Sequence, residues 1–289
     1  MKIRLVVFPL LLAWYFATAK EIVLGQPELY ALLETSPKTF FPARFDHVAR
    51  IRQIYRNGEA LLSVDGLCDE FGLDGVGVYG YEQAGKDGVF LKIGVGLLQS
   101  DGAPAYKNET PYRVVKTFPI SVQSESNLVK VSQRVQWKNI AYFYTKLYQI
   151  NTEKKVLRIT WILRNEGKEP LAFTHYNHNY FRFAPRGSCL RVNFPLPPAP
   201  PYTFISTGNG FLTPMKSGAY WSFDFEEKRF VQITLPHRVR IRPGCSIFRF
   251  AFYADDTCFA PELFVRRVCL PSQETSWYCD WFLDIQEGK

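Results

Sequence analysis

The side chains best suited to chemistry lie in an alternating segment from position 173 to 183. Neighbouring residues of a strand point to opposite faces, so Tyr176, His178, Tyr180 and Arg182 share one face. Such a face is poor core material. It suits a sugar cleft, where aromatic rings stack on sugar C–H faces and polar tips bond hydroxyls. The ordinary alternative for a lone histidine is a hydrogen-bonded side chain inside a sheet.

Two other patterns resemble metal or cofactor motifs but lack the context that these motifs need. His175 and His178 are three residues apart, which places them on opposite faces of a strand rather than around one metal ion. Residues 75–80 read G-V-G-V-Y-G, yet a turn-like segment follows where a dinucleotide site needs a helix N-terminus. The chain has no Cys-x-x-Cys pair that would indicate zinc. The sequence therefore predicts neither a metal nor a cofactor.

The segment Tyr176–Phe181 resembles the N-H-x-Y-F motif of the galactose mutarotases, which are the aldose 1-epimerases. Further short segments resemble a bacterial mutarotase-like subfamily and follow the same order along the chain: Ala43–Asp46, Phe71–Gly72, Gly80–Ala84, Phe90–Leu98, Cys258–Phe264 and Glu274–Trp277. Each segment is only moderately specific, but their order and spacing together are stronger evidence. The resemblance implies the galactose mutarotase-like supersandwich, a large antiparallel β-sandwich, and an activity that interconverts sugar anomers.

Interconverting anomers requires the sugar ring to open and close. One group protonates the ring oxygen while another removes the proton of the anomeric hydroxyl, and the ring then closes from the other face. A histidine with a pKa of about 6.5 can be the acid at neutral pH, and a glutamate with a pKa of about 4.3 is an ionised base. By resemblance, His178 is the expected general acid and Glu262 the general base. Without the resemblance, Glu262 is an ordinary surface carboxylate beside Pro261.

Other parts of the chain depart from the pattern of the better-known mutarotases. Those enzymes carry a second active-site histidine upstream and an Asp-His motif that binds sugar hydroxyls, and neither is visible here. Arg44, Asp46 and Lys92 are the candidates for these roles, although each could equally be a structural charge. Tyr176 and Tyr180 are expected to contact the sugar. The departures leave open a noncatalytic carbohydrate-binding protein on the same fold, with a lyase or hydrolase as a weaker alternative.

Strands must position these residues, because alternation with a period of two dominates the chain. Leu157, Ile159 and Trp161 alternate with polar residues, and similar runs predict roughly fifteen strands and an all-β fold. Pro27–Glu34 is the one segment expected to form a short helix, with proline in its first turn. The proline-rich segment 195–201 reads as a surface loop. Residues 20–289 are therefore expected to form a single domain.

Residues 1–19 read as a secretory signal peptide. Lys2 and Arg4 precede an apolar stretch that is too short to span a bilayer comfortably, and Ala17–Ala19 resembles a cleavage site. We expect the protein to be exported, either secreted or periplasmic, and to have no membrane association once the signal is cleaved. An uncleaved anchor is the alternative.

Charge and cysteine content bound the partners and the compartment. Loss of the signal lowers the formal charge from +8 to +6, and the remaining basic residues are dispersed, which argues against a nucleic-acid partner. The expected partner is a carbohydrate, and the oligomeric state is left open. Six cysteines in an exported chain could form up to three disulfides. Cys245–Cys258 and Cys269–Cys279 are plausible pairs, although the sequence does not decide the pairing.

Overall fold

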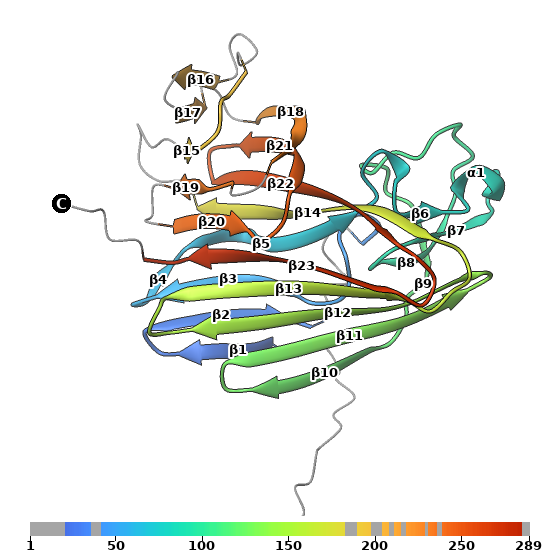
Figure 1. Ribbon diagram of the computed structural model, residues 1–289, viewed down its shortest axis with the longest axis horizontal. Coiled ribbons are helices and arrows are strands. Elements are labelled where there is room, and N and C mark those ends of the chain that lie inside the picture. The colour runs from blue at the N-terminus through green and yellow to red at the C-terminus, as the bar shows by residue number, and fades with distance from the viewer. Residues whose placement is uncertain are drawn as a thin grey trace, which may run out of the picture.

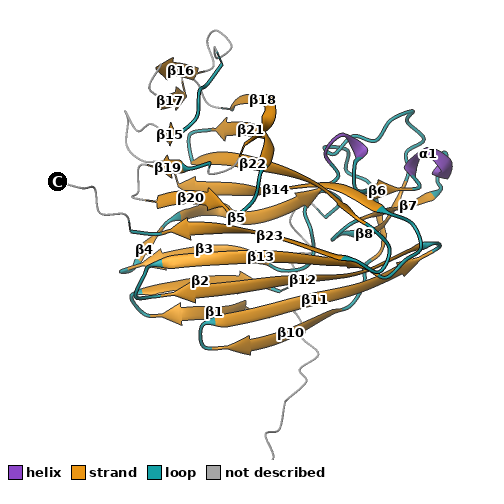
Figure 2. Ribbon diagram, viewed as in Figure 1, coloured by secondary structure: helices purple, strands orange, loops and turns teal. Residues whose placement is uncertain are grey.

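A computed structural model describes residues 21–35, 42–182, 190–197, 204–207, 211–214, 218–228, 231–235 and 239–284. Almost all regular structure in these ranges is antiparallel β-sheet (Figures 1 and 2), which confirms the all-β prediction. The expected signal peptide, residues 1–19, lies outside these ranges. Among the described helices, none has the length and apolar character needed to cross a membrane.

Three antiparallel sheets contain the described strands. The first sheet comprises, in spatial order, β1 (Glu21–Gln26), β2 (Leu29–Glu34), β3 (Arg50–Arg56), β5 (Leu62–Phe71), β14 (Leu171–Arg182), β22 (Cys258–Cys269), β21 (Ile247–Ala254) and β18 (Ala219–Lys228), with β4 (Glu59–Ala60) beside β3. The second comprises β10 (Ile120–Glu125), β11 (Leu128–Trp137), β12 (Ile140–Asn151), β13 (Val156–Asn165), β23 (Glu274–Phe282), β20 (Val239–Pro243), β19 (Ile233–Leu235), β15 (Leu190–Val192), β17 (Phe211–Pro214) and β16 (Phe204–Thr207). The small third sheet comprises β6 (Val78–Tyr79), β7 (Val89–Lys92), β8 (Gly96–Gln99) and β9 (Val114–Lys116), with the short helices η1 (Leu73–Gly75) and α1 (Tyr81–Ala84) beside it (Figure 2).

The first and second sheets pack face to face over one hydrophobic core. Trp161 on β13 and Trp277 and Trp281 on β23 are at most 2% exposed. The indole Nε1 of Trp277 donates to Nδ1 of His175 at 2.9 Å, and that of Trp281 donates to Oδ1 of Asn179 at 2.8 Å. Each such ring removes on the order of 150–250 Å² from water. This packing between β14 and β23 confirms the predicted β-sandwich.

Strand β14 lies inside the first sheet, between β5 and β22 (Figure 1). Its register places His178 opposite Cys68 on β5 and opposite Glu262 on β22. Odd-numbered residues of β14 such as His175 point toward the second sheet, so His178 points away from it. The prediction that His175 and His178 lie on opposite faces is confirmed.

The glycine-rich loop at residues 75–80 leads into the small sheet. Gly75, Gly77 and Gly80 have φ values of 79°, 115° and 79°, which glycine adopts without steric cost. A Cβ atom at Gly80 would also lie 2.9 Å from the Trp137 ring. These angles and this close approach confirm that the segment needs glycine, but Val78–Tyr79 form β6 and the four-residue helix α1 follows, which corrects the expectation of a loop with a turn after it.

Two expectations from the sequence are wrong. Pro27–Glu34 is not a helix: β2 pairs with β1, and its residues Leu29, Ala31 and Leu33 are buried with the period of a strand. The proline precedes the strand in the hairpin turn instead of beginning a helix.

The cysteine pairs are the second correction. Cys68, Cys258, Cys269 and Cys279 are free thiols in the part of the chain that the structure describes, so neither expected disulfide forms. Cys269 and Cys279 belong to strands of different sheets, and the Cys269 thiol donates to the Gln273 carbonyl at 3.2 Å. Cys189 lies outside the described residues.

Candidate functional site

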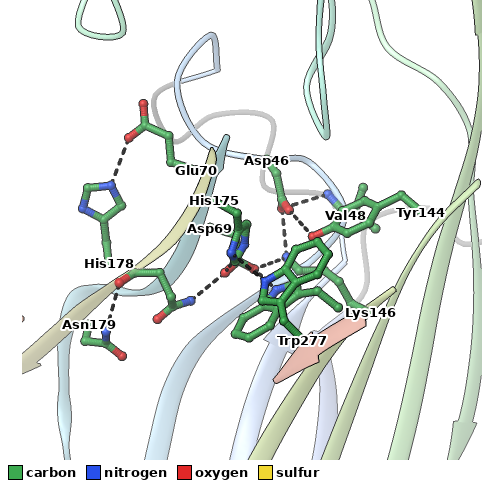
Figure 3. A network of polar contacts seen from close by, with 12 residues as sticks. Asp46, Val48, Asp69, Glu70, Tyr144, Lys146, His175, His178, Asn179 and Trp277 are labelled. Atoms are coloured by element: carbon green, nitrogen blue, oxygen red, sulfur yellow. Dashed lines mark hydrogen bonds and ion pairs between the residues drawn. The ribbon is translucent and has the colours of Figure 1, made fainter. Parts of the chain in front are cut away.

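His178 is held between two carboxylates. Its Nδ1 lies 2.5 Å from Oε1 of Glu262, and its Nε2 lies 3.0 Å from Oε2 of Glu70 (Figure 3 shows the Glu70 contact). Glu262 comes from β22, and Glu70 from β5, on the other side of β14. The three residues are 2%, 5% and 0% exposed, in the order His178, Glu262, Glu70. The structure thus brings the two residues expected to be catalytic into direct contact and adds a second carboxylate.

Glu70 is the centre of a buried charged cluster. Arg44 donates through Nε to Oε2 of Glu70 at 2.9 Å, and the hydroxyl of Tyr176 donates to the same oxygen at 2.6 Å. The Nζ of Lys92 lies 3.5 Å from Oε1 of Glu70 and donates to the Arg44 carbonyl at 2.7 Å. A carboxylate with so many donors is fixed in place, so Glu70 orients the His178 ring.

Charge balance sets the protonation of this cluster. Burial alone would raise the pKa of Glu70, but Lys92, His178 and Arg44 hold it well below its ordinary value. Burial alone would lower the pKa of His178, yet Glu262 and Glu70 raise it above its ordinary value. His178 therefore keeps its second proton to a higher pH than a free imidazole does. A histidine in this state can donate a proton.

Aromatic rings enclose the histidine. The Tyr180 ring is parallel to that of His178 at 5.6 Å between centroids, and its hydroxyl lies 3.4 Å from Nδ1. Phe45 meets the His178 ring edge-on at 4.9 Å. Tyr176 stacks on Phe264 at 4.0 Å and is only 2% exposed. Tyr180 is only partly buried and lies with Glu262 at the Nδ1 edge of His178, a residue that is itself 2% exposed.

A second polar cluster lies behind β14, inside the sandwich (Figure 3). The Nζ of Lys146 lies 2.9 Å from Oδ1 of Asp46 and 2.5 Å from Oδ2 of Asp69. Tyr144 donates to Asp46 at 3.1 Å, and Nε2 of His175 lies 3.4 Å from Asp69. Burial raises the pKa of Asp46 to about 7, whereas at Asp69 Lys146 and His175 outweigh burial and lower the pKa.

The five residues expected to bind sugar therefore do not all lie beside His178. Asp46 belongs to the interior cluster, which corrects the expectation that its carboxylate faces a sugar at His178. Lys92 and Tyr176 lie in the His178 cluster but are buried against Glu70, and their polar groups contact its carboxylate. Arg44, whose side chain is 29% exposed, and Tyr180 border both the cluster and solvent.

The sequence reasoning missed Glu70, Asp69 and Lys146. Asp69 and Glu70 are adjacent carboxylates inside β5, and their neighbours Cys68 and Phe71 are buried. Two consecutive acids within an apolar strand would have been a usable signal, because buried charges need partners on each face of the sheet. Lys146 sits in the same way among the buried tyrosines of β12.

Metal binding has no support from this arrangement. Within the described ranges, no group of three or more His, Cys, Asp and Glu side chains has a geometry that could hold a metal ion. Glu70, the carboxylate beside Nε2 of His178, instead binds Arg44, Lys92 and Tyr176. The chemistry open to the site is proton transfer and hydrogen bonding.

No family model and no curated protein matches the sequence. Solved structures do match. A candidate aldose 1-epimerase from Escherichia coli K12 is 10% identical, with a TM-score of 0.63 over 92% of this chain and 99% of that chain. A galactose mutarotase-like protein from Clostridium acetobutylicum is 12% identical, with a TM-score of 0.57 over 94% of this chain and 97% of that chain. The chain has the galactose mutarotase-like fold.

A third similar structure is galactose 1-epimerase from Lactobacillus acidophilus NCFM. It is 10% identical, with a TM-score of 0.52 over 96% of this chain and 98% of that chain. The mutarotase-like fold implied by the motif around His178 is therefore confirmed, while identities this low establish the fold and not the activity.

Proposed function

We propose that this mutarotase-like chain is an aldose 1-epimerase-like isomerase that interconverts the anomers of a free reducing sugar. The observation that carries the proposal is the placement of His178 between Glu70 and Glu262. One carboxylate is locked by Arg44 and Tyr176, and the other contacts the opposite edge of the ring, beside the partly buried Tyr180. An acid and a base for ring opening are thus adjacent.

The geometry divides the two carboxylates by role. Glu70 fixes Nε2 and helps to keep the ring charged, because its own charge is held by Arg44 and Lys92. The proton on Nδ1 is then available to the ring oxygen of the sugar. Glu262 accepts the proton of the anomeric hydroxyl, and ring closure from the opposite face returns both protons. Each such group typically contributes about 10²–10⁴-fold to the rate.

The sugar has to separate His178 from Glu262, because they are in contact at 2.5 Å. Insertion replaces their hydrogen bond with two bonds to the sugar, one from Nδ1 to the ring oxygen and one from the anomeric hydroxyl to Glu262. Arg44 and Tyr180 are the partly exposed neighbours that can bind the rest of the sugar. Contacts between catalytic groups often differ between the free and the substrate-bound enzyme.

The experiment is anomer exchange measured by polarimetry or saturation-transfer NMR with a panel of common aldoses. We expect faster equilibration than in buffer, and at least about a 100-fold loss in His178→Asn and in Glu262→Gln. Glu82→Gln on the exposed surface of α1 is the matched control and should retain the rate. If the protein accelerates the equilibration of none of the aldoses in the panel, the proposal is refuted.

A noncatalytic carbohydrate-binding protein is the second candidate. The direct contact between His178 and Glu262, and their near-complete burial, favour it because no sugar ring fits between them as they stand. This candidate predicts sugar-dependent stabilisation without turnover. Substituting His178 would then change the affinity for sugar and leave the anomerisation rate at its value in buffer.

A hydrolase finds less support. Glu70 and Glu262 supply two carboxylates around His178, but glycoside hydrolysis needs one carboxyl group to carry a proton. The cations around Glu70 hold its pKa far below neutrality, so this group stays ionised. Its partners Arg44 and Tyr176 also occupy the oxygen that a leaving group would need.

A further inference from the structure

A large cleft lies on the second sheet, away from the His178 cluster. It encloses about 710 Å³, within the range typical of ligand sites, and shares no lining residue with the cluster around His178. Its floor is a row of side chains across four paired strands, Gln149 on β12, Arg158 on β13, Asp280 on β23 and Arg242 on β20. Because Leu157 and Ile159 point into the core, this row belongs to the outer face of the sandwich.

The centre of the floor is rigid. Arg158 binds Asp280 through two hydrogen bonds of 2.6 and 2.8 Å, and its guanidinium lies 4.1 Å from the centre of the Tyr278 ring. Asp280 is 2% exposed. A paired, stacked arginine is oriented before any ligand arrives, so little conformational entropy is lost on binding.

The rim carries exposed hydrogen-bond donors. Arg242 has a half-exposed side chain that lies 4.0 Å from Asp280 and 4.9 Å from the centre of the Phe282 ring. Lys154 and Gln149 are exposed and line the same cleft, together with Asn127. Because Arg158 neutralises Asp280, the accessible charges are those of Arg242 and Lys154 against one acid at the rim, Glu125.

We propose that this cleft binds an acidic oligosaccharide, with a sugar carboxylate at Arg242 and Lys154 and sugar hydroxyls at the amides of Gln149 and Asn127. Guanidinium and ammonium groups recognise carboxylates, and amide side chains both donate to and accept from hydroxyls. Phe282 adds an apolar ring to the lining, next to Arg242. The site is independent of the proposed isomerase activity and would keep the chain on an acidic glycan.

The test is calorimetric titration with trigalacturonate as the acidic probe and galactotriose as its neutral counterpart. We expect trigalacturonate to bind and galactotriose to bind at least about tenfold more weakly, a difference of about 1.4 kcal/mol. Arg242→Gln and Lys154→Gln should each weaken the binding of trigalacturonate about tenfold. Both side chains are exposed, so these variants fold, whereas a change at Arg158 would leave Asp280 buried without its partner.

Two control variants test whether the binding of trigalacturonate depends on this cleft. Lys130→Gln removes a positive charge from β11 of the same sheet but outside the cleft lining, and should leave the affinity unchanged. His178→Asn should also leave it unchanged. Absence of binding, equal binding of the neutral probe, an equal loss in Lys130→Gln, or a loss in His178→Asn but not in Arg242→Gln would each overturn the proposal.

Discussion

Replacing Glu70 with glutamine removes one of the two negative charges that hold the second proton of His178. The contact between Oε2 of Glu70 and Nε2 of His178 is 3.0 Å and fully buried. A hydrogen bond to a charged group contributes about 1.5–3 kcal/mol, which corresponds to about a 10- to 150-fold change in an equilibrium. The amide oxygen can still accept from Arg44 or Tyr176, while the amide nitrogen then faces Lys92 Nζ, which loses this acceptor.

The sign of the effect follows from the role of His178 as an acid. Activity is lost as the pH rises through its pKa, and Glu70 is one of the groups that raise that pKa. In Glu70→Gln the alkaline limb of kcat/KM should move to lower pH, with about a 10- to 150-fold loss of rate above the wild-type limb. The assay is anomer exchange by NMR as a function of pH, with Glu82→Gln as the control. An alkaline limb that coincides in the two variants would refute the reasoning.

Three further predictions follow from the burial and charge of particular residues. Lys146→Met leaves Asp46 and Asp69 buried without their shared cation and should lower the free energy of unfolding by about 3–5 kcal/mol in urea; a loss below about 1 kcal/mol would contradict the structural role of this lysine. The wild type should lose stability progressively as the pH falls below about 4, because Glu70 and Asp69 have lowered pKa values and contribute their full stability only above the pKa values that they have when unfolded; pH-dependent thermal melts with an unchanged midpoint down to about pH 3 would contradict this. We propose that residues 1–19 are cleaved as a signal peptide, so mass spectrometry of the expressed protein should find Lys20 as its first residue, whereas an intact residue 1 would support a retained anchor.

Much of the fold could be predicted because strand alternation is a local signal. The separation of His175 and His178 onto opposite faces follows from their odd spacing on a strand. In the structure His175 contacts Trp277 of the second sheet, whereas His178 contacts Glu70 on the other face. The segment 27–34 shows the limit of that signal: Leu29, Ala31 and Leu33 fit a strand as well as a short helix, and pairing with β1 decides the outcome.

The candidate site was predictable only in part, because its geometry depends on which strands are neighbours. The resemblance of the segment Cys258–Phe264 led to Glu262, and the register of β14 with β22 places it directly opposite His178. The adjacent acids of β5 were a local signal of buried charge, but the contact of Glu70 with His178 depends on the pairing of β14 with β5, which no local pattern reveals. The sequence left open whether Asp46 binds sugar or is a structural charge, because its partner Lys146 lies about 100 positions along the chain, in β12 of the second sheet.

The most direct test of the central claim is a double-mutant cycle on anomer exchange with His178→Asn and Glu262→Gln. If the two residues act as one acid–base unit, each single variant loses at least about 100-fold in rate, and the double variant is no slower than the slower single variant. We predict this non-additive result for single and double variants whose unfolding midpoints equal that of the wild type. Wild-type rates in either single variant, or losses that multiply in the double variant, would contradict it.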